Sequence, residues 1–253
     1  MFPRALLHTA AVCTLIASSA LFSACSDDAT PAATTGPDRT IYAPIRIEAE
    51  MTTSSIAPSA KKDGSAHITA GAVVDSIRIT KLKMLVARIY MYRDRFASAN
   101  GSNTVKKGTA LCAPPVEGGS AWLCNGNLPT GTYNLLRFEL ENTADSATIL
   151  SVPEIAKILN TGPNSTIIEG VSYSNGVATP FEYRTDALPD LSIDVTPTIV
   201  ISAGVSHTMI LSVDPTSVFK SNGSVLDPSD PANKTLIDAG IPNSFRGIRA
   251  KQL

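Results

Sequence analysis

The stretch IRITKLKMLVARIYMYR, residues Ile77–Arg93, decides the fold of this chain. Its apolar residues recur at every second position, which is the period of a β-strand, but the phase of the pattern changes twice. The β-branched and aromatic residues favour a strand over the alternative of a helix. The two phase changes predict either bulges or a sharply bent strand that passes between two sheets. The three apolar groups are Ile77 and Ile79, then Leu82, Met84 and Val86, then Ile89 and Met91.

Further strand patterns lie on both sides of this stretch. Residues 42–50 alternate apolar and charged residues, and residues 128–142 place a Pro and Gly turn before an alternating strand. That second strand is expected to bury Leu136, Phe138 and Leu140 on one face. Its other face would then present Tyr133, Leu135, Arg137 and Glu139.

Turn and helix signals complete the pattern. Asn175-Gly176 predicts a tight hairpin, and Ala203-Gly204 predicts a second hairpin between residues 196–202 and 207–214. A short helix is expected from Pro153 to just before Gly162. Residues 51–66 are expected to form a mobile connection, and residues from 214 onward a loop-rich tail with a short helix near 217–219. The sequence therefore predicts a mostly β protein, an antiparallel β-sandwich of Ig-like type with one short helix.

Charge and length limit the classes of function. The 253 residues carry 21 Lys and Arg against 22 Asp and Glu. The chain therefore has no excess of positive charge to neutralise phosphates, and nucleic acid is not an expected partner. The length suits one domain, placed at residues 44–253, after an export segment and a linker.

The N-terminus has the layout of an export signal. Arg4 precedes an apolar stretch and small residues, which predicts a removable signal peptide over residues 1–24. The ending Phe22-Ser23-Ala24-Cys25 resembles the bacterial lipobox, which implies cleavage before Cys25 and lipidation of its thiol. An ordinary signal peptide is the alternative. Residues 25–43 are polar and small and predict a flexible tether. We therefore expect an outer-membrane lipoprotein that faces either the periplasm or the cell surface.

Two cysteines remain in the exported domain. Export to an oxidising compartment predicts a structural disulfide between Cys112 and Cys124, which would close a loop of about 13 residues and stabilise the fold by roughly 3 kcal/mol. Metal binding by the pair is the rival interpretation, but the spacing is not C-x2-C and neither His67 nor His207 is close in sequence.

Three segments occur in an order that suggests a family. They are SIRITKLKMLVARIYMYR, LPTGTYNLLRFEL and IVISAGVSHTMILSVDPTSVF. Together they resemble bacterial lipoproteins of unknown function whose domain is a carboxypeptidase-regulatory-like, transthyretin-like sandwich, with Gly131, Tyr133 and Arg137 at the matching core. Residues 141–190 look like an insertion in that pattern. The resemblance implies a fold and a location, and it transfers no catalytic residues.

The sequence contains no motif that predicts an enzyme. His67 and His207 are the candidate general bases, and neither lies in a nucleophile or zinc motif, although a triad assembled from distant positions stays open. Asp214, Asp227 and Asp230 are weak candidates for Ca²⁺, and turn or helix capping explains them more simply. Glu139 and Glu141 share one strand face and are candidates for a pair of glycosidase acids. Exposed, charged positions on a sheet explain them more simply. No cofactor and no catalytic residue is predicted.

Three aromatic residues are candidates for a binding role. Tyr90 and Tyr92 share a face of the long strand, and Trp122, the single tryptophan, lies between the two cysteines. They could form a platform that stacks a sugar or contacts a protein partner, while the alternative is that Trp122 closes the end of the sandwich. We expect a lipid-anchored binding or assembly module of the envelope. A pilin-like fibre subunit and an uncharacterised hydrolase are the alternatives, and the short basic tail FRGIRAKQL argues against strand exchange at the C-terminus.

Overall fold

Two packed β-sheets form the body of the chain in the computed structural model, which describes residues 40–53, 55–56, 74–93 and 102–251. The strands up to the helical region are β1 (Tyr42–Met51), β2 (Ser55–Ile56), β3 (Ser76–Tyr92), β4 (Ser102–Cys112), β5 (Ser120–Pro129) and β6 (Gly131–Leu140). After it come β7 (Thr166–Ser174), β8 (Val177–Thr185), β9 (Asp190–Ile201), β10 (His207–Val213), β11 (Lys220–Ser221), β12 (Ser224–Val225) and β13 (Phe245–Ala250).

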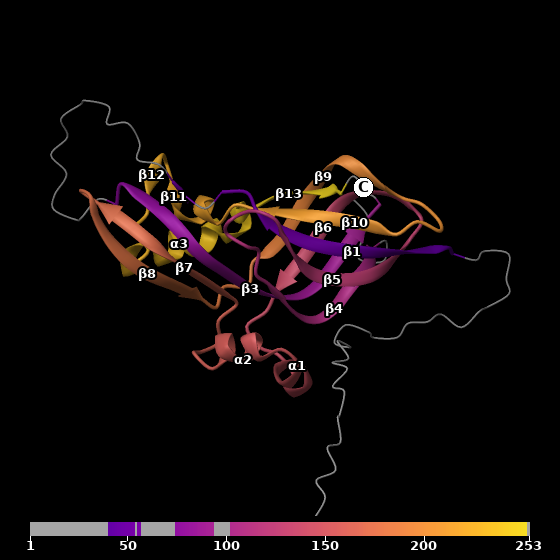
Figure 1. Cartoon of the computed structure of the whole chain (residues 1–253), viewed down its shortest axis with the longest axis horizontal. Coiled ribbons are helices and arrows are strands. Elements are labelled where there is room, and N and C mark those ends of the chain that lie inside the picture. Colours follow the sequence, from indigo (N-terminus) through magenta and orange to yellow (C-terminus); the bar gives the residue numbers. More distant parts are fainter. Residues whose placement is uncertain (1–39, 54, 57–73, 94–101, 252–253) are drawn as a thin grey trace, which may run out of the picture.

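The smaller sheet has four strands in the order β13-β10-β1-β5, and the larger has seven, built around β3. Within the larger sheet the order is β8-β7-β3-β6-β9, with β2 and β4 paired to the free side of β3. The inner faces of both sheets share one core of buried apolar side chains, and Figure 1 shows the long strands crossing the molecule. The predicted β-sandwich is therefore confirmed. The described strand pairs are antiparallel except for β1 with β10, which run parallel.

Strand β3 contains the predicted bulges. Its register shifts between Ile79 and Lys81 against β7, and between Val86 and Arg88 against both β4 and β6. These are the two places where the apolar phase of the sequence changes, because an extra residue on one strand reverses which side chains face the core. Ile79, Leu82, Val86 and Ile89 are consequently all buried. The strand stays within one sheet.

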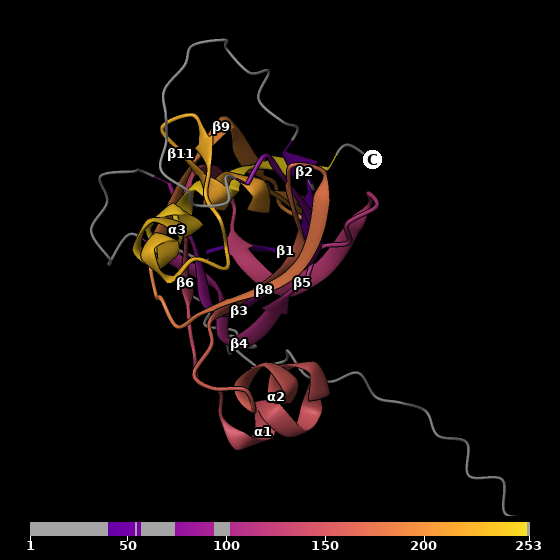
Figure 2. The ribbon, with the colours of Figure 1, turned by 90° about the vertical axis from the view of Figure 1, so that its left-hand side faces the viewer.

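Strands β6 and β7 lie end to end along the same side of β3, and a helical segment separates them. The segment carries α1 (Ser146–Ser151) and α2 (Pro153–Leu159) and projects from the sandwich (Figure 2). Its two ends meet at Leu85, whose backbone N–H donates to the Ser165 carbonyl at 2.8 Å and whose carbonyl accepts from the Glu141 N–H at 3.0 Å. The Leu85 side chain is buried under the helices, with Ile155, Ile158 and Ile167.

The helix signals are partly confirmed. Pro153 begins α2 as predicted, with Glu154 in the first turn, while α1 was not predicted. Asp145 caps α1 by accepting from the Thr148 N–H at 2.6 Å. The helix α2 is tied to the sheet by the Lys83 to Glu154 ion pair at 2.7 Å. Whether residues 141–190 are an insertion concerns related sequences and stays a prediction.

One predicted hairpin is correct and the other is wrong. Asn175 and Gly176 have φ of 51° and 80°, and they join β7 to β8. The turn at Ala203-Gly204 joins β9 to β10, but these strands belong to different sheets and do not pair with each other. Strand β10 pairs with β1 on one side and with β13 on the other, so neither edge is open to β9.

Tyr133 also differs from expectation. It was predicted on the face opposite to Leu136 and Phe138, but its ring is completely buried in the same core. The register against β9 is irregular here, because Tyr133 is opposite Ile199 while Leu135 is opposite Asp194, and the alternation of β6 changes phase at this irregularity so that the ring faces inward. Its hydroxyl donates to the Pro129 carbonyl at 2.7 Å, so its polar end is satisfied.

The C-terminal tail is not loop-rich. It forms η2 (Pro215–Phe219), which confirms the short helix expected there, and then η3 (Pro231–Asn233), α3 (Lys234–Gly240), η4 (Ile241–Ser244) and β13. These short elements bury Phe219, Ile237 and Ile241 in the main core. The tail therefore completes the sandwich and adds the edge strand of the smaller sheet.

Candidate functional site

The outer face of the four-stranded sheet carries an ordered set of polar side chains around one exposed indole. Strand β1 alternates strictly, so that Ile45, Ile47 and Ala49 enter the core while the residues between them point outward. We call the outward-pointing residues the outer face. They are Arg46, Glu48 and Glu50 of β1, Ser120, Trp122 and Asn125 of β5, Ile210 and Ser212 of β10, and Arg249 and Lys251 at the C-terminal end.

Glu48 is at the centre of this face and is only 6% exposed. Its carboxylate accepts hydrogen bonds from Ser120 of β5 at 2.5 Å and from Lys251 at 3.3 Å. Arg46 forms a second ion pair with it at 2.9 Å. The hydrogen bond from Ser120, followed by the contacts with Lys251 and Arg46, lowers the pKa of Glu48 against the opposing effect of burial. The carboxylate is thus held charged and in one position.

Glu50 repeats the arrangement one step along β1. It accepts from the Ser212 hydroxyl at 2.8 Å and pairs with Arg249 at 3.0 Å. These contacts cross three strands, because Ser212 lies on β10 and Arg249 on β13. The network leaves Arg46, Arg249 and Lys251 about half exposed at their side chains, so donors remain available to a ligand.

Trp122 lies beside Glu48. The two residues are paired in register between β5 and β1 and so share the outer face. The indole is 46% exposed, and its Nε1–H donates to the Asn125 side-chain oxygen at 3.1 Å, which orients the ring. Trp122 therefore does not close the end of the core. An oriented aromatic face beside fixed charges and hydroxyls can stack a flat ligand and bind its polar edge.

The aromatic residues of β3 are on the other sheet. Ile89 and Met91 enter the core, so Tyr90 and Tyr92 share the outer face of the seven-stranded sheet, as predicted from their spacing. Tyr90 contacts Arg88, and Tyr92 is 5% exposed beside Arg137. The structure does not bring either tyrosine to Trp122, and the predicted three-residue platform is wrong because β3 and β5 belong to different sheets.

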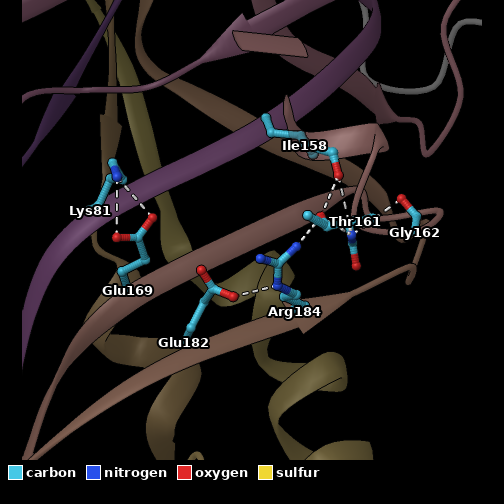
Figure 3. Close-up of polar contacts among 8 residues, drawn as sticks. Lys81, Ile158, Thr161, Gly162, Glu169, Glu182 and Arg184 are labelled. Carbon is cyan, nitrogen blue, oxygen red and sulfur yellow. Dashed lines mark hydrogen bonds and ion pairs between the residues drawn. The ribbon is translucent and has the colours of Figure 1, made fainter. Parts of the chain in front are cut away.

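A separate set of polar contacts lies on the seven-stranded sheet, at β3, β7 and β8, beside the end of the helical segment (Figure 3). Lys81 pairs with Glu169 at 2.9 Å, and Glu182 pairs with Arg184 on β8. Arg184 also donates to the Thr161 hydroxyl at the end of the helical segment. Of these contacts, the hydrogen bond from Arg184 to Thr161 ties the helical segment to β8, while the two ion pairs lie within the sheet.

The three aspartates considered for Ca²⁺ cap turns. Asp214 accepts from the Thr216 N–H and hydroxyl and pairs with Arg246 at 2.8 Å, and these contacts lower its pKa although burial acts in the opposite direction. Asp227 and Asp230 accept the N–H groups of Ser229 and Ala232 at 2.8 and 2.9 Å. No three His, Cys, Asp or Glu side chains of the described residues gather closely enough to hold a metal ion.

The residues considered for catalysis do not assemble either. His207 accepts from the Ser202 N–H at 3.0 Å, and His67 lies outside the described residues. Glu139 is within 3.3 Å of Arg88 and 3.9 Å of Arg137. Glu141 is partly buried, and desolvation raises its pKa. His207 and Glu139 are thus held by contacts with the chain itself, while burial disfavours the charged form of Glu141.

Cys112 and Cys124 are both buried, and no disulfide joins them in the described residues. Burial raises the pKa of the Cys112 thiol to about 12. That thiol is therefore protonated and poorly reactive in the folded protein. The predicted bridge is not seen.

Comparisons with protein-family models, with curated proteins and with solved structures found no match. No helix among the described residues has the length and apolar content needed to span a bilayer. Cys25 and the export segment lie outside the described residues. The outer face is accordingly the basis for the functional proposal.

Glu48 predicts a pH dependence of stability. Because its pKa is lower in the folded chain than the ordinary value of 4.5, its contribution is complete above that value and is lost as the pH falls through the folded pKa. Replacing Glu48→Gln should lower the free energy of unfolding by about 1 kcal/mol at pH 7 and by less at pH 3. Urea unfolding at both pH values measures this difference. The control is Glu117→Gln on the exposed turn before β5, and an equal loss for Glu48→Gln at both pH values would contradict the prediction.

Proposed function

We propose that this chain is a lipid-anchored, non-enzymatic binding module of the bacterial cell envelope, and that it binds glycan through the outer face around Trp122. The observation that carries the proposal is the exposed, oriented indole beside the charged Glu48 network. Sugars offer apolar ring faces and a rim of hydroxyls, and this face presents an aromatic surface with donors and acceptors next to it. A protein partner is an alternative outcome of the test.

The anchor is part of the same proposal. The export segment ends in Ser23-Ala24-Cys25, and the described body begins at Thr40. The 15 residues from Cys25 to Thr40 can span at most about 50 Å. A module held this close to a membrane would meet polymers of the envelope at its surface, on either side of the outer membrane.

The structure supports a binding module over a fibre subunit assembled through its C-terminus. Strand β13 is paired with β10 within the same sheet. A donor strand for a neighbouring copy would have to leave this position and uncover Phe245 and Ile248, which are buried.

A glycan array tests the proposal with the parent and the Trp122→Ala variant. Loss of a stacking anchor of about 1.4 kcal/mol or more predicts at least a tenfold weaker signal on any glycan that the parent retains. The matched control is Tyr90→Ala, which removes a partly exposed ring from the opposite sheet and should leave binding unchanged. Equal binding by Trp122→Ala would remove the outer face from the proposal, and retention of proteins alone would favour the protein alternative.

We also propose that Cys112 and Cys124 form a disulfide in the exported protein. Both side chains are buried in the same core. Since the folded Cys112 thiol is protonated, the bridge would form before folding is complete. Alkylation of the denatured, unreduced protein should add no mass at either cysteine. Alkylation of both would contradict the bridge.

A further inference from the structure

One end of the sandwich gathers the start of β1, the turn between β5 and β6, and the turn between β9 and β10. The Thr130 N–H donates to the Ile41 carbonyl at 2.8 Å, and Tyr42 is paired with Pro129. Ile45 is paired with His207, which brings the β9–β10 turn to the same end. Figure 1 shows the first residues of β1 beside that turn. We call residues 40–45, 128–134 and 196–207 the N-terminal pole.

Apolar side chains are exposed across this pole. Ile41 is 54% exposed and Tyr42 49%, while Val200 and Val205 on the β9 side are 59% and 47% exposed. None of the residues in its three segments is Asp or Glu. Arg93 is exposed at the same end, where its guanidinium donates to the Thr130 carbonyl at 2.6 Å. The described segments of the pole thus expose four apolar side chains, contain no Asp or Glu and lie close to a cation.

We propose that the N-terminal pole contacts the phospholipid surface to which Cys25 is anchored. The inference rests on the proposed lipid anchor. The proposed tether joins the described body at Thr40, immediately before Ile41 and Tyr42. The attachment point therefore brings this end nearest to the bilayer. Aliphatic and tyrosine side chains insert about 5–10 Å into the interface, and the absence of carboxylates from these segments avoids repulsion from anionic headgroups.

This contact would also orient the outer face. Trp122 is opposite Glu48, six residues along β1 from Tyr42, which corresponds to about 20 Å at 3.4 Å per residue. With the pole on the bilayer, Trp122 would stand clear of the lipid. Side chains at positions 42 and 122 are thus expected to lie at different distances from the acyl chains.

Indole fluorescence in vesicles with brominated acyl chains tests the contact. The full chain is processed in the cell, purified, and reconstituted in phosphatidylethanolamine and phosphatidylglycerol vesicles. The native protein has its single tryptophan at Trp122, and the Tyr42→Trp/Trp122→Phe variant moves the indole to the pole. The variant should lose roughly half of its emission relative to vesicles without bromine, because an interfacial side chain reaches the acyl boundary. The native protein should lose almost none.

Flotation of the same samples separates the two proposals. Protein that floats with the vesicles but shows no quenching for the Tyr42→Trp/Trp122→Phe variant would overturn the contact and leave the anchor intact. Protein that does not float would overturn the anchor, and the contact with it. A further Ile41→Ser/Val205→Ser change should restore emission without releasing the protein, and unchanged quenching there would contradict the role of the pole.

Discussion

Replacing Phe219→Ala should lower the free energy of unfolding by about 3–5 kcal/mol. Phe219 is completely buried, and its ring packs edge-to-face against Phe181 and Tyr183 at centroid distances of 5.5 and 6.0 Å. The loss combines the transfer energy of the ring with the cavity left behind. Because η2 and α3 close the core beside β8, the surrounding short elements would have to shift to fill that cavity. Urea unfolding of the parent and the variant measures the effect.

The matched control for this prediction is Leu236→Ala. Leu236 belongs to α3 in the same region, but its side chain is 51% exposed. A surface substitution of this kind changes stability by at most about 0.5 kcal/mol. If Phe219→Ala cost no more than Leu236→Ala, the tail would not be part of the cooperative core.

The same tail shows why part of the fold escaped prediction. Its buried residues Phe219, Ile237, Ile241 and Phe245 form no repeated pattern within one element, because each belongs to a different short element. Periodicity detects an element only when several turns or several strand residues repeat it. The core position of these residues depends on contacts with β8 and β6, for example the Phe138 to Phe245 ring contact at 4.3 Å.

Strand β3 represents the opposite case. It is long enough for its phase to be read three times, so the positions of both irregularities follow from the sequence, while the choice of bulges over a bent strand comes from the strand register. The turn at Asn175-Gly176 was also predictable, since a tight turn needs the positive φ that these two residues tolerate. The turn at Ala203-Gly204 carries a similar local signal, but local chemistry does not show that β1 occupies the place beside β10.

The candidate site was predictable only in outline. The alternation of residues 42–50 places Arg46, Glu48 and Glu50 on one strand face, and Trp122 was recognised as the single tryptophan. The partners of Glu48 come from Ser120 and Lys251, far away along the chain, and no local pattern connects them. The missing information was the order β13-β10-β1-β5, which brings these segments together.

Replacing Cys25→Ser should abolish the fatty acylation that we propose for this chain. Each buried CH₂ of a lipid contributes about 0.8 kcal/mol, and a single chain gives only marginal membrane binding, so stable anchoring needs two or more chains on one site. Ser offers no thiol for the first of them. The expected result is a complete loss of lipid from the N-terminal peptide, measured by its mass, and a loss of the protein from the outer-membrane fraction.

Mass is the deciding measurement because fractionation alone is ambiguous. A chain that keeps its leader could remain at a membrane through the apolar stretch Ala5–Phe22 without any lipid. The matched control is Cys13→Ser, which removes the other cysteine of the N-terminal region but lies within the segment predicted to be cleaved. Its mature N-terminus should begin at Cys25 and carry the same lipid as the parent. An acylated Cys25→Ser protein, or a parent beginning at another residue, would contradict the anchor and with it the orientation inferred for the outer face.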